Sequence, residues 1–282
     1  MIRFGPSGNS ARFYDEKFKS SVDAPKWLAE QGLSAYEYSF GKGINISDAK
    51  ANEIGAKGLE YDVAISVHAP YYINFANPSD ELVEKSYNYV LNSCLKARQF
   101  YGSRVVFHAS TVGKMERRDA VELTKKRLEI LADMIVANGM DDCLFCPETM
   151  GRINQIGDTE EIVEFCKIAD FYLPTIDFGH LNARTYGSLK TAEDYDKIIS
   201  HIIDNLGMER ASKMHVHFSK IEYSKGGEVR HLTFADSVFG PEFEPLARVL
   251  HKYRLEPVII CESNGTQTDD ALEMKRIYDS IV

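Results

Sequence analysis

Histidines and acids stand at the ends of short apolar runs along most of this chain. The run at residues 173–176 ends in Asp177, and His180 follows three residues later. The same arrangement recurs at His68, His108, Glu148, His215 and Glu262. Imidazoles and carboxylates without thiolates are ligand types that zinc and manganese accept. The pattern therefore predicts a metal centre containing zinc, with manganese as the alternative ion.

Further residues extend this candidate set. Gly179 separates Asp177 from His180, and we expect it to let the backbone turn so that both side chains face one volume. His215 and His217 are two residues apart and so face the same side of a strand. His215 is the expected ligand, whereas His217 is expected to bind metal, contact substrate or support a ligand. Two more candidates, Glu228 and His231, lie in the polar connection after these histidines.

The elements that must position these residues alternate between strand and helix. Eight apolar runs have the length and β-branched content of buried strands: residues 2–4, 35–40, 64–67, 104–107, 143–146, 173–176, 214–218 and 257–261. Helical spacing of apolar residues is found between them, at 24–30, 48–57, 83–94, 116–138, 159–168, 192–205, 243–253 and 269–281. Ser79 is an expected N-cap and Gly139 an expected left-handed C-cap. Residues 219–240 are expected to form a long loop without clear periodicity.

Eight strand and helix repeats predict an α/β fold, a single (β/α)8 TIM barrel formed by residues 1–282. A doubly wound sheet is the alternative, but no G-x-G-x-x-G motif follows the first run. The carboxyl ends of barrel strands meet at one rim, so the candidate ligands would converge there. Crowded buried carboxylates and imidazoles favour bound divalent cations.

Composition limits the class of protein. The chain has 282 residues, 44% of them hydrophobic, and a formal net charge of −9. This charge argues against a general nucleic-acid coat, although bound metals would offset several carboxylates. Five cysteines in mostly apolar surroundings and no apolar run of membrane-spanning length lead us to expect a soluble, cytoplasmic monomer. Basic residues near the expected loops form a possible phosphate track: Lys42, Lys114, Arg117, Arg118, Arg152, Arg184, Lys220, Lys225 and Arg230.

The order and spacing of the ligand candidates resemble the endonuclease IV family of zinc-dependent apurinic/apyrimidinic endonucleases, a group of xylose-isomerase-like barrels. The resemblance extends from His68 to Glu262. The family segment H-x-x-Y-x-I-N is matched at residues 68–74, and its F-H pair at 107–108. Its strand end E-x-x-G is matched at 148–151, D-x-x-H at 177–180, and M-H at 214–215.

This resemblance implies three zinc ions and double-stranded DNA with abasic sites as the partner. His68, His108 and Glu148 would hold one ion, and Glu148 would bridge to a second ion held by Asp177, His215 and Glu262. His180 and His231 would hold the third ion. The family places an aspartate two residues before the last histidine, where this chain has Val229. Glu228 is the nearest carboxylate and is expected to reach this ion instead.

Substrate contacts are also implied by the resemblance. Tyr71 and Tyr72 match the position where the family inserts aromatic or apolar side chains into the duplex. The arginine-containing loop that the family carries after its second strand is replaced here by residues 39–43. His217 and Arg230 are further candidates for contact with the substrate.

The expected reaction is hydrolysis of DNA 5′ to an abasic site, with metal-activated water as nucleophile and Glu148 and Glu262 orienting the metals. A metal-dependent sugar isomerase or epimerase is the alternative, because Glu148, Asp177, His215 and Glu262 suffice for one manganese ion. A third hypothesis is a barrel that binds nucleic acid without catalysis. The number of metal ions per chain distinguishes the first two.

Overall fold

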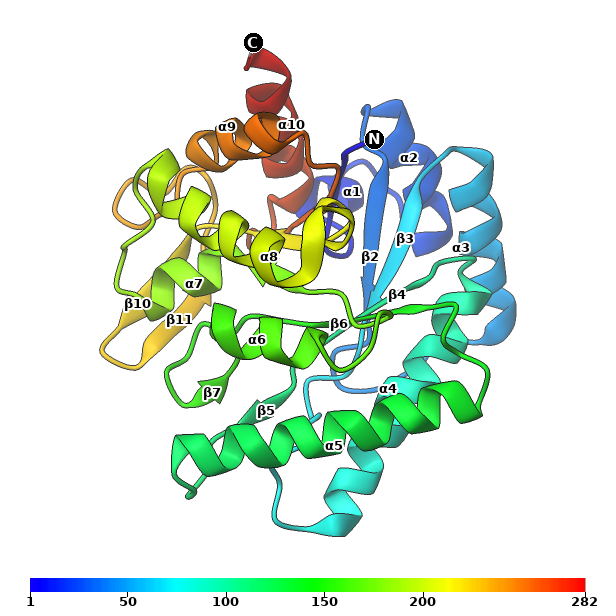
Figure 1. Cartoon of the computed structure of the whole chain (residues 1–282). Helices are drawn as coiled ribbons and strands as arrows, with labels where there is room; N and C mark the ends of the chain where they lie inside the picture. The colour runs from blue at the N-terminus through cyan, green and yellow to red at the C-terminus, as the bar shows by residue number, and fades with distance from the viewer. Residues whose placement is uncertain (282) are drawn as a thin grey trace.

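Eight parallel strands form a closed barrel in the computed structural model, which describes residues 1–281 (Figure 1). The strands are β1 (Arg3–Pro6), β2 (Ala35–Ser39), β3 (Ala64–His68), β4 (Arg104–Phe107), β6 (Leu144–Pro147), β8 (Thr175–Asp177), β9 (His215–Phe218) and β12 (Val258–Cys261). Their hydrogen-bonded order is β1-β12-β9-β8 and β2-β3-β4-β6. Parallel bridges from Ser7 to Glu37 and from Glu148 to Thr175 close the barrel. The predicted (β/α)8 barrel is confirmed; Val282, the end of the expected domain, lies outside the described residues.

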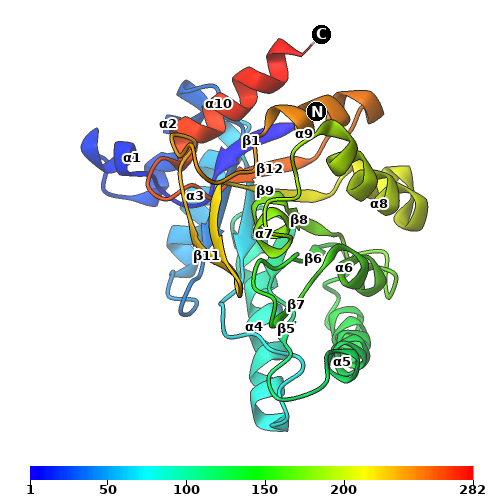
Figure 2. The ribbon, with the colours of Figure 1, turned by 90° about the vertical axis from the view of Figure 1, so that its left-hand side faces the viewer.

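Helices follow the strands and surround the barrel (Figures 1 and 2). They are α2 (Ala24–Glu30), α3 (Asp48–Glu60), α4 (Asp80–Gln99), α5 (Arg117–Ala137), α6 (Thr159–Cys166), α8 (Ala192–Ser212), α9 (Glu244–Tyr253) and α10 (Gln267–Ser280). Each buries an apolar side, as α4 does with Val83, Val90 and Cys94. Ser79 precedes α4 without a capping hydrogen bond from its side chain, and Gly139 after α5 has φ +60° as expected. Within residues 1–281, every helix is too short or too polar to cross a membrane.

Several short elements lie in the loops at the carboxyl ends of the strands. They are α1 (Ala11–Asp15), the 3-10 helix η1 (Ser21–Asp23), the strand pair β5 (Ser110–Thr111) and β7 (Gln155–Ile156), α7 (Phe178–Arg184), and the hairpin of β10 (Ile221–Ser224) and β11 (Gly227–His231). The expectation of an irregular loop at residues 219–240 is therefore wrong in its first half. The hairpin was missed because its strands are short and mostly polar.

Gly179 does not act as the expected turn. It lies inside the first turn of α7, which begins directly after Asp177. A side chain at residue 179 would place its Cβ 2.5 Å from the carbonyl oxygen of Ser219. The glycine is needed because α7 packs closely against the backbone after β9, rather than because the chain requires a special conformation there.

The barrel interior changes from apolar to polar toward the carboxyl ends of the strands. Side chains two residues apart on a strand face the same side. Val106, Cys146 and Ile260 are buried two residues before His108, Glu148 and Glu262, respectively. Two small apolar clusters therefore fill the lower interior, Ala35 with Val258 and Ile260, and Val106 with Cys146 and Leu173. Directly above them, the same strands present ionisable side chains.

Candidate metal centre

Histidines and acids from distant parts of the sequence meet at the carboxyl end of the barrel. Their ligand atoms form four groups, and within each group the atoms lie within 4.8 Å of one another. The His68 group contains His68, His108 and Glu148; the Asp177 group contains Glu148, Asp177, His217 and Glu262; the His180 group contains His180, Glu228 and His231; and the Glu37 group contains Glu37, His215 and His217. The convergence expected from the barrel is therefore present.

The His68 group directs two imidazoles at one carboxylate oxygen. His68 Nε2 lies 3.1 Å and His108 Nε2 3.2 Å from Glu148 Oε2. His68 Nδ1 donates a hydrogen bond to the carbonyl oxygen of Ala69, 2.8 Å away. That bond fixes the proton on Nδ1 and leaves Nε2 as the nitrogen that can bind a metal.

The Asp177 group uses the other oxygen of the same carboxylate. His217 Nδ1 lies 3.1 Å from Glu148 Oε1 and 3.5 Å from Glu262 Oε2. Asp177 Oδ1 accepts the backbone N–H of His180 at 2.7 Å as the N-cap of α7. Asp177 Oδ2 is buried and has no hydrogen-bond partner among the described residues. Glu148 therefore offers one oxygen to each of two neighbouring groups, the geometry of a bridging ligand.

The His180 group combines α7 with the β10–β11 hairpin. Glu228 Oε2 lies 3.5 Å from His180 Nε2, and Glu228 Oε1 lies 3.9 Å from His231 Nε2. His180 Nδ1 donates to the carbonyl oxygen of Thr149 at 2.9 Å. His231 Nδ1 is hydrogen-bonded to the hydroxyl of Ser219 at 2.8 Å. Both imidazoles thus keep Nε2 turned toward the Glu228 carboxylate.

A β-bulge brings Glu228 into the His180 group, although the endonuclease IV motif has its aspartate at the position of residue 229. Residues 228 and 231 are three apart and would face opposite sides of a regular strand. The register shifts between Glu222 and Tyr223, which pair with Arg230 and Glu228. Val229 is the extra residue and is 44% exposed. The bulge therefore brings the side chains of Glu228 and His231 to the same side of the strand.

Gly151 allows this hairpin to approach the metal-site region. The backbone N–H of Glu228 donates to the carbonyl oxygen of Gly151 at 3.1 Å. A Cβ at residue 151 would lie 2.7 Å from the Cβ of Glu228 and 2.9 Å from Cδ2 of His180. The glycine of the matched E-x-x-G segment therefore has a packing reason in this chain.

The electrostatics of these groups suit divalent cations. Within residues 1–281, none of the carboxylates in the four groups has a lysine or arginine as ion-pair partner. Burial and two neighbouring carboxylates raise the pKa of Asp177 to about 6, although the charge of His180 opposes this shift. Burial also disfavours the charged form of Glu148, but His217 and other imidazoles hold its pKa well below the usual range. Metal ions would replace the imidazole protons as the positive charges among these carboxylates.

His215 is not where the sequence analysis expected it. On the neighbouring strands β9 and β8, His217 pairs with Asp177 itself, whereas His215 pairs with Thr175, two residues earlier. His217 therefore belongs to the Asp177 group, and His215 lies one layer deeper beside Glu37. The expectation that His215 joins Asp177 and Glu262 is corrected in favour of His217. The choice depended on strand register, which the sequence does not specify.

Glu37 is a member of these groups that the sequence analysis missed. It is fully buried on β2, inside the run predicted as a strand at residues 35–40. A single acid at an inward position of an otherwise apolar and aromatic strand was the available signal. Such a residue needs buried partners, because an unpaired carboxylate would lose its solvation.

A cleft opens above the metal-site residues. One cavity of about 440 Å³ is lined by residues that include His68, His108, Arg152 and Glu262. A second, of about 480 Å³, shares Tyr71, Glu228, His231 and Glu262 with the first. The two cavities therefore continue into one another across the mouth of the barrel.

The Tyr71 side chain forms part of the rim of this cleft. Tyr71 stacks on His108 with ring centroids 5.4 Å apart, and its hydroxyl is hydrogen-bonded to Ser39 Oγ at 3.1 Å. Tyr72, which follows it, is 58% exposed. Arg230 lines the second cavity, and its side chain pairs with Glu222 at 2.7 Å.

Several of the basic residues proposed as a phosphate track have structural partners instead. Arg117 pairs with Glu161, and Lys220 is buried and pairs with Glu242. Arg184 donates to backbone carbonyl oxygens, including that of Arg152. The Arg152 side chain lines the first cavity and has no ion-pair partner within residues 1–281.

Comparison with other sequences gives two informative relatives. The chain is 32% identical over 275 residues to an uncharacterized protein of Methanocaldococcus jannaschii, a match that covers 98% of this chain and 96% of that protein. It is 25% identical over 200 residues to a probable endonuclease 4 of Acholeplasma laidlawii, covering 69% of this chain and 65% of that protein.

Solved structures of two different activities share the fold. Endonuclease IV from Thermus thermophilus superposes with a TM-score of 0.68 at 18% identity, covering 99% of this chain and 98% of that chain. D-psicose 3-epimerase from Clostridium cellulolyticum superposes with a TM-score of 0.64 at 14% identity, covering 99% and 96%. At these identities the likeness shows the fold alone. The model of one family, described as xylose isomerase-like TIM barrel, matches residues 25–278. Because this match extends over most of the chain, the protein belongs to the xylose isomerase-like TIM barrel family.

Proposed function

We propose that this protein is a metal-dependent phosphodiesterase of the endonuclease IV type, which hydrolyses double-stranded DNA 5′ to abasic sites. The observation that carries the proposal is the shared carboxylate of Glu148, with one oxygen in the His68 group and the other in the Asp177 group. The His68, Asp177 and His180 groups together contain more ligand atoms than a single ion can bind. The sequence relationship to a probable endonuclease 4 supports the same reaction class.

The ligand groups have the donor types for two or three zinc ions, with manganese as the alternative. Bound ions would lower the pKa of an attacking water and neutralise charge on the phosphate ester. Glu148 would hold two of the ions at a fixed separation. Glu262, whose side chain is 17% exposed and lines both cavities, would also accept a hydrogen bond from the attacking water. No side-chain nucleophile is required.

The rim of the cleft supplies groups suited to a nucleic acid. Tyr72 is exposed and Tyr71 is held in place by His108 and Ser39, so both offer apolar surface to a base or sugar. Arg152 and Arg230 line the two cavities and would contact phosphates that flank the cleaved bond.

Incision of a labelled duplex with one abasic-site analogue tests the proposal. The metal-loaded protein is expected to cut the modified strand on the 5′ side of the analogue and to leave the unmodified duplex intact. His108→Ala removes one imidazole of the His68 group and serves as the control preparation. If the wild-type protein cuts no faster than this control, the proposed reaction is wrong.

A sugar epimerase or isomerase is a second candidate, because the Asp177 group alone contains three carboxylates and one imidazole. That set would suffice for one manganese ion beside a keto sugar. Elemental analysis separates the two candidates. Two or three metal ions per chain support the phosphodiesterase, whereas about one ion together with interconversion of ketoses supports the epimerase.

A further inference from the structure

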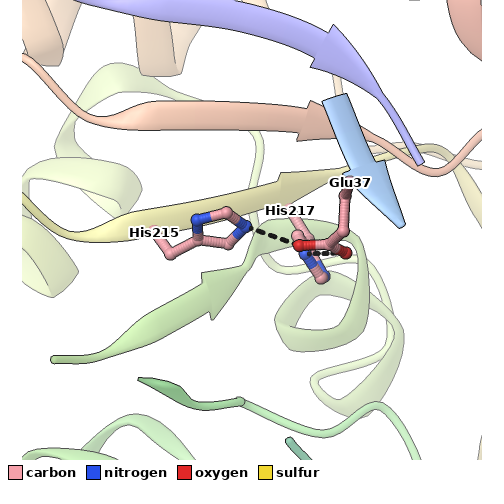
Figure 3. A group of neighbouring side chains, drawn as sticks. All are labelled: Glu37, His215 and His217. Atoms are coloured by element: carbon pink, nitrogen blue, oxygen red, sulfur yellow. Dashed lines mark hydrogen bonds and ion pairs between the residues drawn. The ribbon is translucent and has the colours of Figure 1, made fainter. Parts of the chain in front are cut away.

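Glu37 on β2 contacts two histidines of β9, His215 and His217 (Figure 3). Its carboxylate oxygen Oε2 accepts hydrogen bonds from Ser66 Oγ at 2.9 Å and from His215 Nε2 at 3.0 Å. The other oxygen, Oε1, lies 3.0 Å from His217 Nε2. All three side chains that surround this carboxylate are fully or almost fully buried. Ser66 and His215 therefore hold the carboxylate in position through Oε2, and its other oxygen, Oε1, faces His217.

Glu37 and His215 each stand one inward position before a residue that pairs with a candidate ligand. Glu37 pairs with Ser66, and the residue two positions further along β2, Ser39, pairs with His68. On β9, His215 stands two residues before His217, which pairs with Asp177.

The two nitrogens of His217 face different partners. Nδ1 is 3.1 Å from Glu148 Oε1 and 3.5 Å from Glu262 Oε2, on the side of the cleft. Nε2 faces Glu37 Oε1, and within residues 1–281 neither of these two atoms has a hydrogen-bond partner elsewhere. They form a close ion-pair contact at 3.0 Å with each other. A carboxylate that accepts the N–H of one ring nitrogen fixes the tautomer and makes the other nitrogen a stronger metal ligand.

We propose that Glu37 is a positioning residue for the metal centre: it accepts the Nε2 proton of His217 and so commits Nδ1 to the ion held by Glu148, Asp177 and Glu262. His215 supports Glu37 by donating to its second oxygen and does not itself bind this ion. The inference rests on the metal centre of the proposed function, but it does not require that the reaction be DNA hydrolysis.

Metal affinity of the Glu37→Gln variant tests the inference. Gln keeps the size of the side chain but presents an NH2 group that can donate to Nε2, which would favour the proton on Nδ1. Competitive titration of zinc against a chelating indicator is expected to show one ion bound about 10- to 100-fold more weakly than in the wild-type protein. The other ions are expected to keep their affinity. Unchanged affinity for every ion would overturn the inference.

Two further variants act as matched controls. Ser66→Ala removes one donor to Glu37 and leaves the contact with His217, so it is expected to change zinc affinity less than Glu37→Gln does. His215→Gln keeps a donor near the position of Nε2 and is expected to keep the wild-type number of ions. Loss of one ion per chain in His215→Gln would show that His215 is a ligand and would overturn this part of the inference.

Nitrogen NMR of the metal-loaded wild-type protein gives a test that does not depend on the folding of any variant. The ring nitrogens of His217 are expected to show a protonated Nε2 and a metal-bound Nδ1. A metal-bound Nε2 would overturn the inference. Because these measurements do not use catalysis, absence of DNA incision would reject the proposed reaction while leaving the Glu37 result to be judged separately.

Discussion

His217 Nδ1 lies 3.1 Å from Glu148 Oε1, across β8, which separates β9 from the end of β6. The second oxygen of Glu148 faces His68 and His108. One carboxylate therefore joins two candidate metal sites, and each site depends on the charge and position of that side chain.

Replacement of Glu148 by Gln is expected to weaken two metal sites at once. An amide cannot supply two anionic oxygens, so the charge that offsets two cations is lost. Any hydrolytic activity should fall by more than about 100-fold, the upper range for changes to groups that only orient a ligand. Metal content after desalting, measured by mass spectrometry, should fall by at least one ion per chain. A variant with the wild-type metal content would contradict the bridging role.

Replacement of Glu228 by Gln is expected to remove only the ion of the His180 group. Glu222→Gln on the neighbouring strand is a matched control, because Glu222 pairs with Arg230 at the surface and belongs to none of the four groups. The control should keep its metals. Adding Val229→Asp to Glu228→Gln should not restore the lost ion, because residue 229 is the extra residue of the bulge. Recovery of that ion in the double variant would show that a carboxylate at residue 229, which lines the second cavity, can reach His180 and His231.

Strand positions and the convergence of ligands could be predicted because they depend on local patterns. Apolar runs predicted the eight strands to within two residues at each end, and a closed barrel brings their carboxyl ends together. The depth of a side chain inside the barrel depends instead on how neighbouring strands pair. His215 and His217 have the same inward direction, and only pairing of His217 with Asp177 decides which one reaches the upper layer.

Two features of the site depend on long-range packing and could not be predicted in the same way. Glu37 gains its partners from β3 and β9, far away in the sequence, so its strand alone does not indicate its role. Glu228 reaches its group through a bulge whose register is set by pairing across the hairpin. Glu228 is the nearest carboxylate in the sequence, but the bulge that turns it inward forms only in the folded chain.

Removal of the metals is expected to reverse the effect of pH on stability. Burial lowers the pKa of His108 and that of His215, and this opposing effect on stability is confined to pH values near and below the unfolded pKa of about 6.5. Nearby carboxylates outweigh burial and raise the pKa of His68, His180 and His217. In the metal-free protein their protons are bound more tightly in the folded than in the unfolded state. The resulting stabilisation is present below the pKa of an unfolded-state histidine, about 6.5. It is lost as pH rises through the higher pKa values that these histidines have in the folded protein. The metal-free protein should therefore melt at a lower temperature at about pH 8.5 than at about pH 6.5.

The metal-loaded protein should show the opposite dependence for the part of its stability that comes from metal. Binding must displace the same protons, so metal affinity increases with pH. The rise in melting temperature on adding zinc should be larger at about pH 8.5 than at about pH 6.5. Calorimetry at both pH values, with and without metal, measures the two effects. A zinc-induced rise that shrinks as pH increases would contradict the assignment of these histidines to the metal centre.

Replacement of Arg152 by Ala is expected to weaken binding of duplex DNA without changing metal content. Arg152 lines the cavity above the metal-site residues and has no ion-pair partner within residues 1–281, so its charge is available for a phosphate. Loss of one phosphate contact should lower the slope of log affinity against log salt concentration by about 1, and equally for different DNA sequences. Arg118→Ala is the control, because the Arg118 side chain is 92% exposed and lies outside the residues that line the cleft. If both variants show the wild-type salt slope, phosphate contacts must be made elsewhere on the rim. If only Arg152→Ala lowers it, the position of this arginine above the His68 group supports a path for the DNA backbone across the mouth of the barrel.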